Sequence, residues 1–310
     1  MLKLCVVLLI ATGLTFSAAE QYPTRIQLLQ ANPNLGRNAR FVENFNAKNS
    51  SFRLKLNKFA HLSLRAFTAQ YLSSSGFWDS IPAFNESTPF EQYPEQVDWR
   101  TKNVIAAVQD ETACRGSWSS AYLGAVEAAL SLETGLAKPL SRQQIKDCTR
   151  NLFEAQQWSE SRGICTRGAY PDSKQCSSAC QDHCNSEVVV SRHVQLPFGS
   201  EKDLMAAVSK RPVLAVIRAD SDEFRFYSHG VFEGICGTEL NHAVLIVGYG
   251  IDAETRMPYW LVQNSWGQQW GEEGYIRLLR QEEGVGTGTC GIAIRPSYPR
   301  VFPVEPEPLI

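Results

Sequence analysis

The cysteines divide this chain into two unlike parts. Residues 20–92 contain none, whereas eight of the nine cysteines lie at or after position 114. The eight are Cys114, Cys148, Cys165, Cys176, Cys180, Cys184, Cys236 and Cys290. In an oxidising compartment an even number of cysteines indicates a disulfide framework that ties distant segments together. The second part is therefore expected to be a disulfide-bonded globular unit.

The N-terminus supplies the reason to expect an oxidising compartment. Lys3 precedes an apolar run from Leu4 to Phe16, and small residues follow at 17–19. This arrangement is typical of a cleaved signal peptide over residues 1–19, and the run is too short for a membrane anchor. No later run of about 18 apolar residues occurs, so no membrane span is expected. We expect entry into the secretory pathway and an extracellular or lysosomal location.

The composition is that of a globular protein rather than a nucleic-acid binder. The chain has 310 residues, of which 44% are hydrophobic, and a formal net charge of −2. A near-neutral chain without a basic excess argues against a nucleic-acid partner, and we expect a monomer. Asn-x-Ser sequons at Asn49 and Asn85 agree with a glycosylated chain.

The cysteine-free part carries two helix-like stretches. The first runs through Arg37 to Phe45, and the second covers Phe52 to Leu62 and continues through Phe67 and Tyr71 at helical spacing. Residues 73–92 are rich in Ser, Pro and Asn and are interpreted as a linker.

The second part begins with helices and continues with strands. A buried helix is predicted after Ser117 and is ended by Thr134-Gly135, and a capping box at Ser141 predicts a second helix. Ser200 opens a third helix, which ends before Pro212. Short apolar strands are predicted over 213–217, 243–247, 259–262 and 275–279. Helices first and strands later indicate an α+β fold with a helical half and a β half.

One short segment carries a specific resemblance. Residues 108–118 include Cys114-Arg115-Gly116-Ser117-Trp118. They resemble the nucleophile segment of the papain family, in which a Gln precedes a Cys-Gly-Ser-Cys-Trp run. In that family the residue before the tryptophan is the thiolate nucleophile, and the Gln six residues upstream is an oxyanion donor. These positions hold Ser117 and Glu111 here, and Arg115 replaces the expected glycine.

Two further segments extend the resemblance. Asn241 to Gly250 is similar to the strand that presents the catalytic histidine, which gives His242 the position of the general base. Tyr259 to Gly267 is similar to the asparagine segment, which gives Asn264 the role of orienting that histidine. His242 follows Ser117 by 125 residues, near the spacing of papain-like enzymes. The resemblance covers residues 37–300, and segments 124–127 and 143–148 look most like cathepsin O.

The resemblance implies a domain organisation and partners. It implies an inhibitor-type propeptide and linker over residues 20–92, and a papain-like peptidase domain over 93–310. That domain would have a helical left half over about 93–187, a β-barrel-like right half over about 188–300, and a cleft between them. The expected partners are the chain's own propeptide and a peptide or protein ligand in the cleft.

The resemblance also bears on the cysteines. It pairs Cys236 with Cys290, and it places Cys114 in a disulfide rather than at the nucleophile position. The six central cysteines allow 15 connectivities, and the sequence does not choose among them. Cys176, Cys180 and Cys184 could with His183 form a zinc site on one helix face, but in a secreted chain disulfides are the expected use. No metal and no other cofactor is expected.

The substitutions at the site work against proteolysis. A cysteine is activated because its pKa lies near neutrality, whereas a serine needs its proton removed by a well-placed base during attack. An ionised Glu111 has no proton to donate, and loss of one oxyanion donor alone costs about 10²–10³ in rate. No Gly-Cys-x-Gly-Gly segment, which pairs with extended peptide in the family, occurs between Cys148 and Cys176.

Three functions follow as alternatives. The leading hypothesis is a papain-fold pseudoprotease that acts by binding. The second is a weak serine-nucleophile hydrolase that uses Ser117, His242 and Asn264. The third is a secreted storage or structural protein whose cleft has no role.

Overall fold

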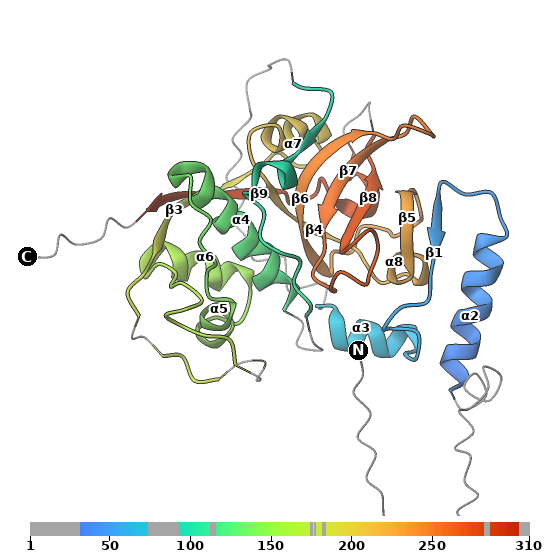
Figure 1. The fold of residues 1–310 in the computed structure, drawn as a ribbon, viewed down its shortest axis with the longest axis horizontal. Helices are drawn as coiled ribbons and strands as arrows, with labels where there is room; N and C mark the ends of the chain where they lie inside the picture. The colour runs from blue at the N-terminus through green and yellow to red at the C-terminus, as the bar shows by residue number, and fades with distance from the viewer. Residues whose placement is uncertain are drawn as a thin grey trace, which may run out of the picture.

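The structure of the chain is a computed structural model. The structure describes residues 32–73, 93–111, 116–173, 176, 178–181, 184–281 and 286–303. The predicted signal peptide, Asn85, Cys114, Arg115 and His183 lie outside these ranges. A helical layer packs against a large sheet, and an N-terminal segment lies at the far edge of that sheet (Figure 1).

Three helices form the helical layer. They are α4 (Ser117–Thr134), α5 (Arg142–Cys148) and α6 (Leu152–Ser161). Helix α4 is buried over most of its length and ends at Gly135, whose φ of 72° suits a residue without a side chain. Helix α5 begins as the capping box predicts, because Ser141 Oγ accepts from Gln144 N at 3.0 Å.

One mixed sheet of nine strands forms the other layer. The strands are β1 (Phe52–Leu54), β2 (Val97–Asp98), β3 (Val188–Gln195), β4 (Val213–Ile217), β5 (Tyr227–Phe232), β6 (His242–Ile251), β7 (Pro258–Gln263), β8 (Tyr275–Leu279) and β9 (Ser297–Pro303). Their order is β1-β5-β8-β7-β6-β4-β9-β3, with β2 paired to β6. Among the strands of the described residues, only β5 and β8 pair in parallel.

The α+β class is confirmed, but the sheet is open rather than closed into a barrel. All four predicted strands are present, and they form its centre as β4, β6, β7 and β8. The predicted third helix is α7 (Glu201–Val208), and a single turn of helix, α8 (Asp222–Arg225), precedes β5. Residues 301–303 are extended and belong to β9, which pairs with β3.

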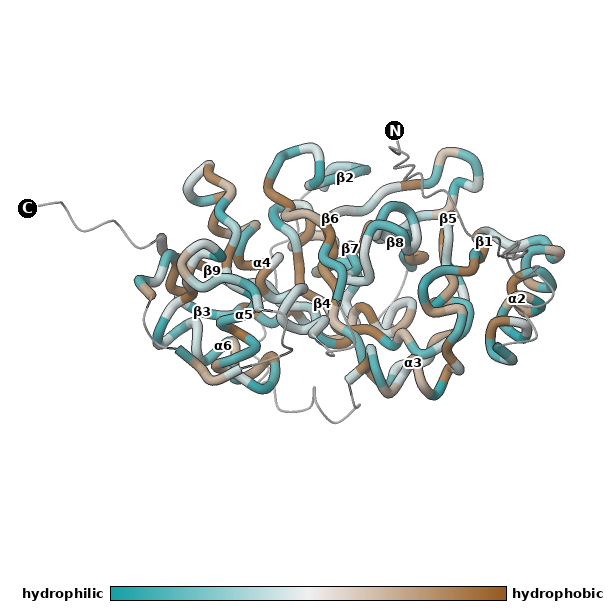
Figure 2. The backbone as a smooth tube through the Cα atoms, turned by 60° about the horizontal axis from the view of Figure 1, so that its bottom comes forward, coloured by the Kyte–Doolittle hydropathy of each residue, from teal (hydrophilic) through white to brown (hydrophobic). Residues whose placement is uncertain are grey.

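The N-terminal segment, residues 32–73, contains α2 (Pro33–Asn46), β1 and α3 (Leu64–Tyr71). The expectation of a helix from Phe52 to Leu62 is wrong, because Phe52–Leu54 is a strand paired with β5. Phe52 and Leu54 are both buried, and their alternation suits a strand once β5 offers an edge. Hydrophobic and hydrophilic positions alternate along α2, as expected for a helix with one covered face (Figure 2).

Two hydrophobic clusters form the core. The first lies between α4 and the sheet and includes Tyr122, Val126, Leu214 and Leu245. The second lies within the β half and includes buried aromatic residues of the N-terminal segment. The N-terminal segment therefore shares a core with the β half.

The disulfides use cysteines that a zinc site would need. Disulfides join Cys148 to Cys180, Cys165 to Cys184 and Cys236 to Cys290, and Cys176 is also disulfide-bonded. The pair implied by the resemblance, Cys236–Cys290, is thus formed in the structure. The described residues between 176 and 184 are not helical, so the helix face that a zinc site would need is missing there.

A membrane-spanning helix needs about 20 mostly apolar residues. Among the described residues, no helix is long and apolar enough to span a membrane.

Candidate active site

Three of the four predicted site residues lie where elements begin or end. Ser117 is the first residue of α4, His242 is the first residue of β6, and Asn264 directly follows β7. Strands β6 and β7 are antiparallel neighbours, so the start of β6 meets the end of β7. The fold thereby brings residues 117, 242 and 264 to one end of the contact between the two layers.

The His242 ring is held by Asn264. The Nε2 of His242 lies 2.8 Å from Asn264 Oδ1, which also accepts from Ser265 N at 2.7 Å. An amide oxygen accepts only, so Nε2 carries the proton of the neutral ring. The indole of Trp266 packs against the ring with centroids 4.7 Å apart. This hydrogen bond and the indole together fix the orientation and the tautomer of the ring.

His242 is kept neutral. The residue is 0% exposed, and this burial lowers the pKa of its imidazole to about 4, although the hydrogen bond with Asn264 raises it somewhat. Its Nδ1, the nitrogen available to act as a base, has no hydrogen-bond partner. The ring is a neutral base. Its Nδ1 lone pair accepts no hydrogen bond, and its proton affinity is low.

Ser117 is close to His242 but is not engaged by it. Its Oγ lies 3.3 Å from the backbone nitrogen of Ala243 and accepts that N–H. The side chain is fully buried, and no hydrogen bond joins its hydroxyl to His242 Nδ1. Activation of an alcohol needs such a bond to the base, so the observed geometry is not that of an activated serine.

Glu111 places a buried carboxyl group at the site. Its backbone N–H donates to Ser265 O at 2.8 Å. Both carboxylate oxygens are buried, and neither accepts a bond of normal hydrogen-bond geometry, although the hydroxyls of Ser265 and Ser120 interact with the carboxyl. Burial raises the pKa of this carboxyl to about 7, against smaller lowering effects of the Ser265 and Ser120 hydroxyls and of the Lys146 and Lys58 charges. The group is therefore largely protonated in acid and largely ionised in mild alkali.

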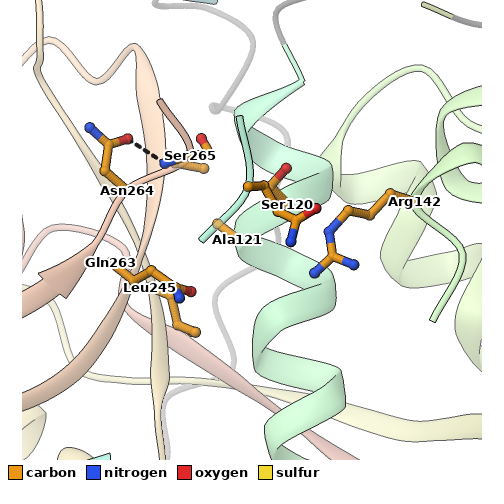
Figure 3. Close-up of a pocket in the computed structure, with 9 residues that line it drawn as sticks. Ser120, Ala121, Arg142, Leu245, Gln263, Asn264 and Ser265 are labelled. Atoms are coloured by element: carbon orange, nitrogen blue, oxygen red, sulfur yellow. Dashed lines mark hydrogen bonds between the residues drawn. The ribbon is translucent and has the colours of Figure 1, made fainter. Parts of the chain in front are cut away.

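Two hollows flank the site. The first, of about 10 Å³, lies between α4 and strands β6 and β7, with Ser120 and Arg142 on one side and Asn264 and Ser265 on the other (Figure 3). It has room for about one water molecule. The second, of about 200 Å³, is lined by Glu111 and Lys146 among others. Neither hollow is lined by Ser117 or His242.

Sequence reasoning missed a buried ion pair behind the site. Arg142 Nη2 lies 2.9 Å from Glu127 Oε2, and Glu127 Oε1 also accepts from Leu140 N at 2.8 Å. Both side chains are more than nine-tenths buried. The pair ties α4 to the start of α5. Spacing along the chain gives no signal for it, because 15 residues separate the partners.

The described residues hold no group of three or more His, Cys, Asp or Glu side chains placed to bind a metal ion. The site consists of a buried serine, a neutral histidine with its asparagine, and a buried carboxyl.

These features define a class of protein. The helical layer begins with Ser117, and the sheet supplies His242 and Asn264. This arrangement is that of a papain-like peptidase fold. A family model described as papain family cysteine protease matches residues 93–300, and the chain belongs to this family.

Individual relatives agree. The thiol protease SEN102 of Hemerocallis is 35% identical over 291 residues, which cover 87% of this chain and 80% of that protein. The cysteine proteinase EP-B 1 of Hordeum vulgare is 36% identical over 287 residues, covering 84% and 76%. A solved structure of a recombinant stem bromelain precursor superposes with a TM-score of 0.79 at 31% identity, covering 90% and 93%.

Proposed function

We propose that this protein is a papain-family member without cysteine protease activity, which acts by binding a peptide or protein. The observation that carries the proposal is the environment of Ser117. Its hydroxyl accepts from Ala243 N, while His242 Nδ1 has no partner. A thiol at this position gives up its proton to form a nucleophilic thiolate, but an alcohol without a base in contact stays protonated.

The carboxyl of Glu111 supports the same conclusion. In a peptidase, charge develops on the substrate carbonyl oxygen, and donors must face it. Above pH 7 Glu111 is ionised, offers no proton and repels that charge. Both changes fall at one site, so the chemistry is impaired in two independent ways.

A direct measurement tests the proposal. The purified protein should show no labelling by a thiol-directed active-site probe and no turnover of fluorogenic peptides between pH 4 and pH 8. Peptide turnover that disappears in the Ser117→Ala variant would contradict the proposal.

A second candidate is a weak serine hydrolase that uses Ser117, His242 and Asn264, and the raised pKa of Glu111 favours it. Near pH 5 this carboxyl is protonated and can donate, while His242, with its pKa of about 4, is still neutral. The candidate predicts ester hydrolysis that is faster at pH 5 than at pH 8 and is lost in His242→Ala. Equal rates for the variant and the wild type would eliminate it.

The organisation of the chain is part of the proposal. We assign residues 1–19 to a signal peptide, 20–92 to a propeptide and linker, and 93–310 to the peptidase-like domain. Secretory entry is supported by the disulfides, and the location is proposed to be extracellular or lysosomal. The likeness to cathepsin O stays a prediction about the subfamily.

Glycosylation belongs to the same assignment. Asn49 is exposed in the connection between α2 and β1, where an oligosaccharide can be attached. Asn85 is the second proposed acceptor. A mass loss on treatment with an amide-cleaving glycosidase, absent in an Asn49→Gln, Asn85→Gln variant, tests both positions.

A further inference from the structure

A third hollow lies between residues 104–109, helix α4 and the start of helix α5. Its volume is about 210 Å³, and its lining includes neither Ser117 nor His242. A cavity of roughly 150 Å³ already accepts a molecule the size of benzene. This hollow therefore has room for a small organic molecule away from the reacting groups of the site.

Most of the lining is apolar. The apolar residues are Val104, Ile105, Ala106, Ala107, Ala137 and Pro139. Val104 is buried, whereas Ala107, Ala137 and Pro139 are exposed, so the hollow is closed at Val104 and opens to solvent beside the two alanines. A ligand that enters there can place an apolar body against this wall, and burial of apolar surface favours binding.

The wall formed by residues 104–109 is fixed in place before any ligand binds. Ala106 O accepts a hydrogen bond of 2.8 Å from Gln263 Nε2, and Gln109 O accepts one of 2.9 Å from Gly267 N. The side chain of Gln109 is held as well, because its Oε1 accepts from Arg167 Nη2 at 3.3 Å. A preformed wall lowers the entropy that binding would cost.

Arg142 offers the hollow a buried donor. The side chain extends from α5 toward α4 (Figure 3) and is only 8% exposed. Its Nη1 and Nη2 donate to Glu127 Oε1 at 3.1 Å and Oε2 at 2.9 Å, so Glu127 occupies the end of the guanidinium. The Nε at the side edge is buried and has no hydrogen-bond partner among the described residues. A buried donor without an acceptor costs free energy, and a carboxylate is the acceptor that a guanidinium edge binds best.

The charges around the hollow favour an anion. Arg142, Arg167 and Lys138 line it together with one carboxylate, that of Glu127. Arg167 Nε lies 3.3 Å from Asp172 Oδ2, but both side chains are more than a third exposed, and such a pair is weak. Lys138 pairs with Glu187, which is not part of the lining. Three cations and one carboxylate thus face the space that a ligand would fill.

We propose that this hollow is a binding site for a small monocarboxylate whose apolar body is about the size of one aromatic ring. The carboxylate accepts from the Nε–H of Arg142, and the body lies against Val104 and the alanines. An inorganic anion would leave the apolar wall in water, and a neutral molecule would leave the Arg142 edge without a charged acceptor. The proposal goes beyond the proposed function, because it holds whether or not the cleft binds or cleaves a peptide.

The test is a titration of the full folded chain, labelled with carbon-13 at the alanine methyl groups, with sodium benzoate at pH 7 and constant ionic strength. We expect saturable shifts of the methyl signals of Ala106, Ala107 and Ala137, with a dissociation constant on the order of 1 mM. Benzyl alcohol, which has the ring without the charge, and acetate, which has the charge without the ring, should each bind about tenfold more weakly. Equal affinity for benzoate and benzyl alcohol, or no saturable shift of these methyl signals up to 20 mM benzoate, would overturn the proposal.

A first variant tests the donor. Arg142→Lys keeps a positive charge opposite Glu127 but removes the Nε–H edge, so benzoate should bind about tenfold more weakly. The matched control is Arg150→Lys, which makes the same change in an exposed ion pair and should leave benzoate affinity unchanged.

A second variant tests the wall and serves also if Arg142→Lys fails to fold. Ala137→Leu places a larger side chain at the exposed mouth of the hollow and should weaken benzoate binding by about tenfold. Ala253→Leu, at an exposed position in the turn between β6 and β7, is its control and should have no effect. Benzoate affinity that is unchanged in both Arg142→Lys and Ala137→Leu would contradict the assigned site.

Discussion

The Oγ of Ser117 accepts a hydrogen bond of 3.3 Å from the backbone N–H of Ala243. The hydroxyl is thereby used as an acceptor by the residue next to His242, and it is not aligned as a donor to the ring. A sulfur at this position is a much weaker acceptor and would leave the N–H less well satisfied. This hydrogen bond is more typical of a side chain that packs at the start of α4 than of a nucleophile.

Restoring both substituted positions should restore thiol chemistry. The Ser117→Cys, Glu111→Gln variant is expected to be labelled by a thiol-directed probe and to cleave peptides. Ser117→Cys alone should be slower by about 10²–10³, because the oxyanion donor is still missing. The measurement is kcat/KM at pH 6 for both variants. Silence in the double variant would place the defect in peptide binding as well.

The stability of the protein should depend on pH through Glu111. Its pKa is raised from 4.5 to about 7 in the folded state, so the folded state binds more protons than the unfolded state between these values. Stability therefore falls as pH rises through this window, by on the order of 3 kcal/mol. Glu111→Gln should remove this loss and be the more stable protein at pH 8. Urea unfolding at pH 5, 6, 7 and 8 measures it, and parallel curves for the two proteins would refute the assignment.

His242 should act in the opposite direction. Burial lowers its pKa to about 4, so between that value and its ordinary value near 6.5 the unfolded state binds the extra proton. Its contribution therefore destabilises the fold as pH falls through this range. Nitrogen NMR of the imidazole should show the Nε2–H tautomer and no charge at pH 5.5. In Asn264→Ala the fixed tautomer should be lost, whereas Asn151→Ala, at a distant helix cap, should leave the spectrum of His242 unchanged.

The buried ion pair should matter far more than an exposed one. Removing one partner leaves the other charge buried and unpaired, so Glu127→Gln and Arg142→Met should each cost about 3–5 kcal/mol of unfolding free energy. The comparison is Arg150→Ala, which breaks an exposed pair with Glu154, and which should leave the denaturation midpoint unchanged. Equal effects at the two pairs would show that burial does not govern them.

The central cysteines should be found in the pairs seen here. Non-reducing peptide mapping is expected to recover Cys148 linked to Cys180 and Cys165 linked to Cys184, as well as Cys236 linked to Cys290. Replacing both Cys236 and Cys290 by Ser should lower stability by about 2–4 kcal/mol, because this bridge closes a long loop. A Cys148–Cys165 peptide would contradict the fold around α5.

Local signals in the sequence predicted much of the fold. The helix at Ser117, its end at Gly135 and the capping box at Ser141 all depend on neighbouring residues, and each was predicted correctly. The segment 52–54 was not, because its state is decided by pairing with β5, which lies far along the chain. The ion pair of Glu127 with Arg142 was also not predicted, because its two partners are 15 residues apart in the sequence.

The site, like the fold, was predicted only in part from the sequence. The resemblance of residues 241–250 and 259–267 to the family's segments predicted that His242 and Asn264 would meet, and the two side chains are in contact. It gave no sign that Ser117 would bond to Ala243 N, or that burial would bring the pKa of Glu111 to about 7. Those features arise from the packing of α4 against β6, which no single stretch of sequence encodes.

The indole of Trp266 packs against the rings of Phe59 and Phe67, and it also packs against the ring of His242. One indole is therefore in contact with both the N-terminal segment and the imidazole of His242. Lifting the segment would let this indole relax, and the ring currents felt by the carbon-bound protons of His242 would change. The chemical shifts of His242 can therefore report on whether the N-terminal segment is packed against Trp266.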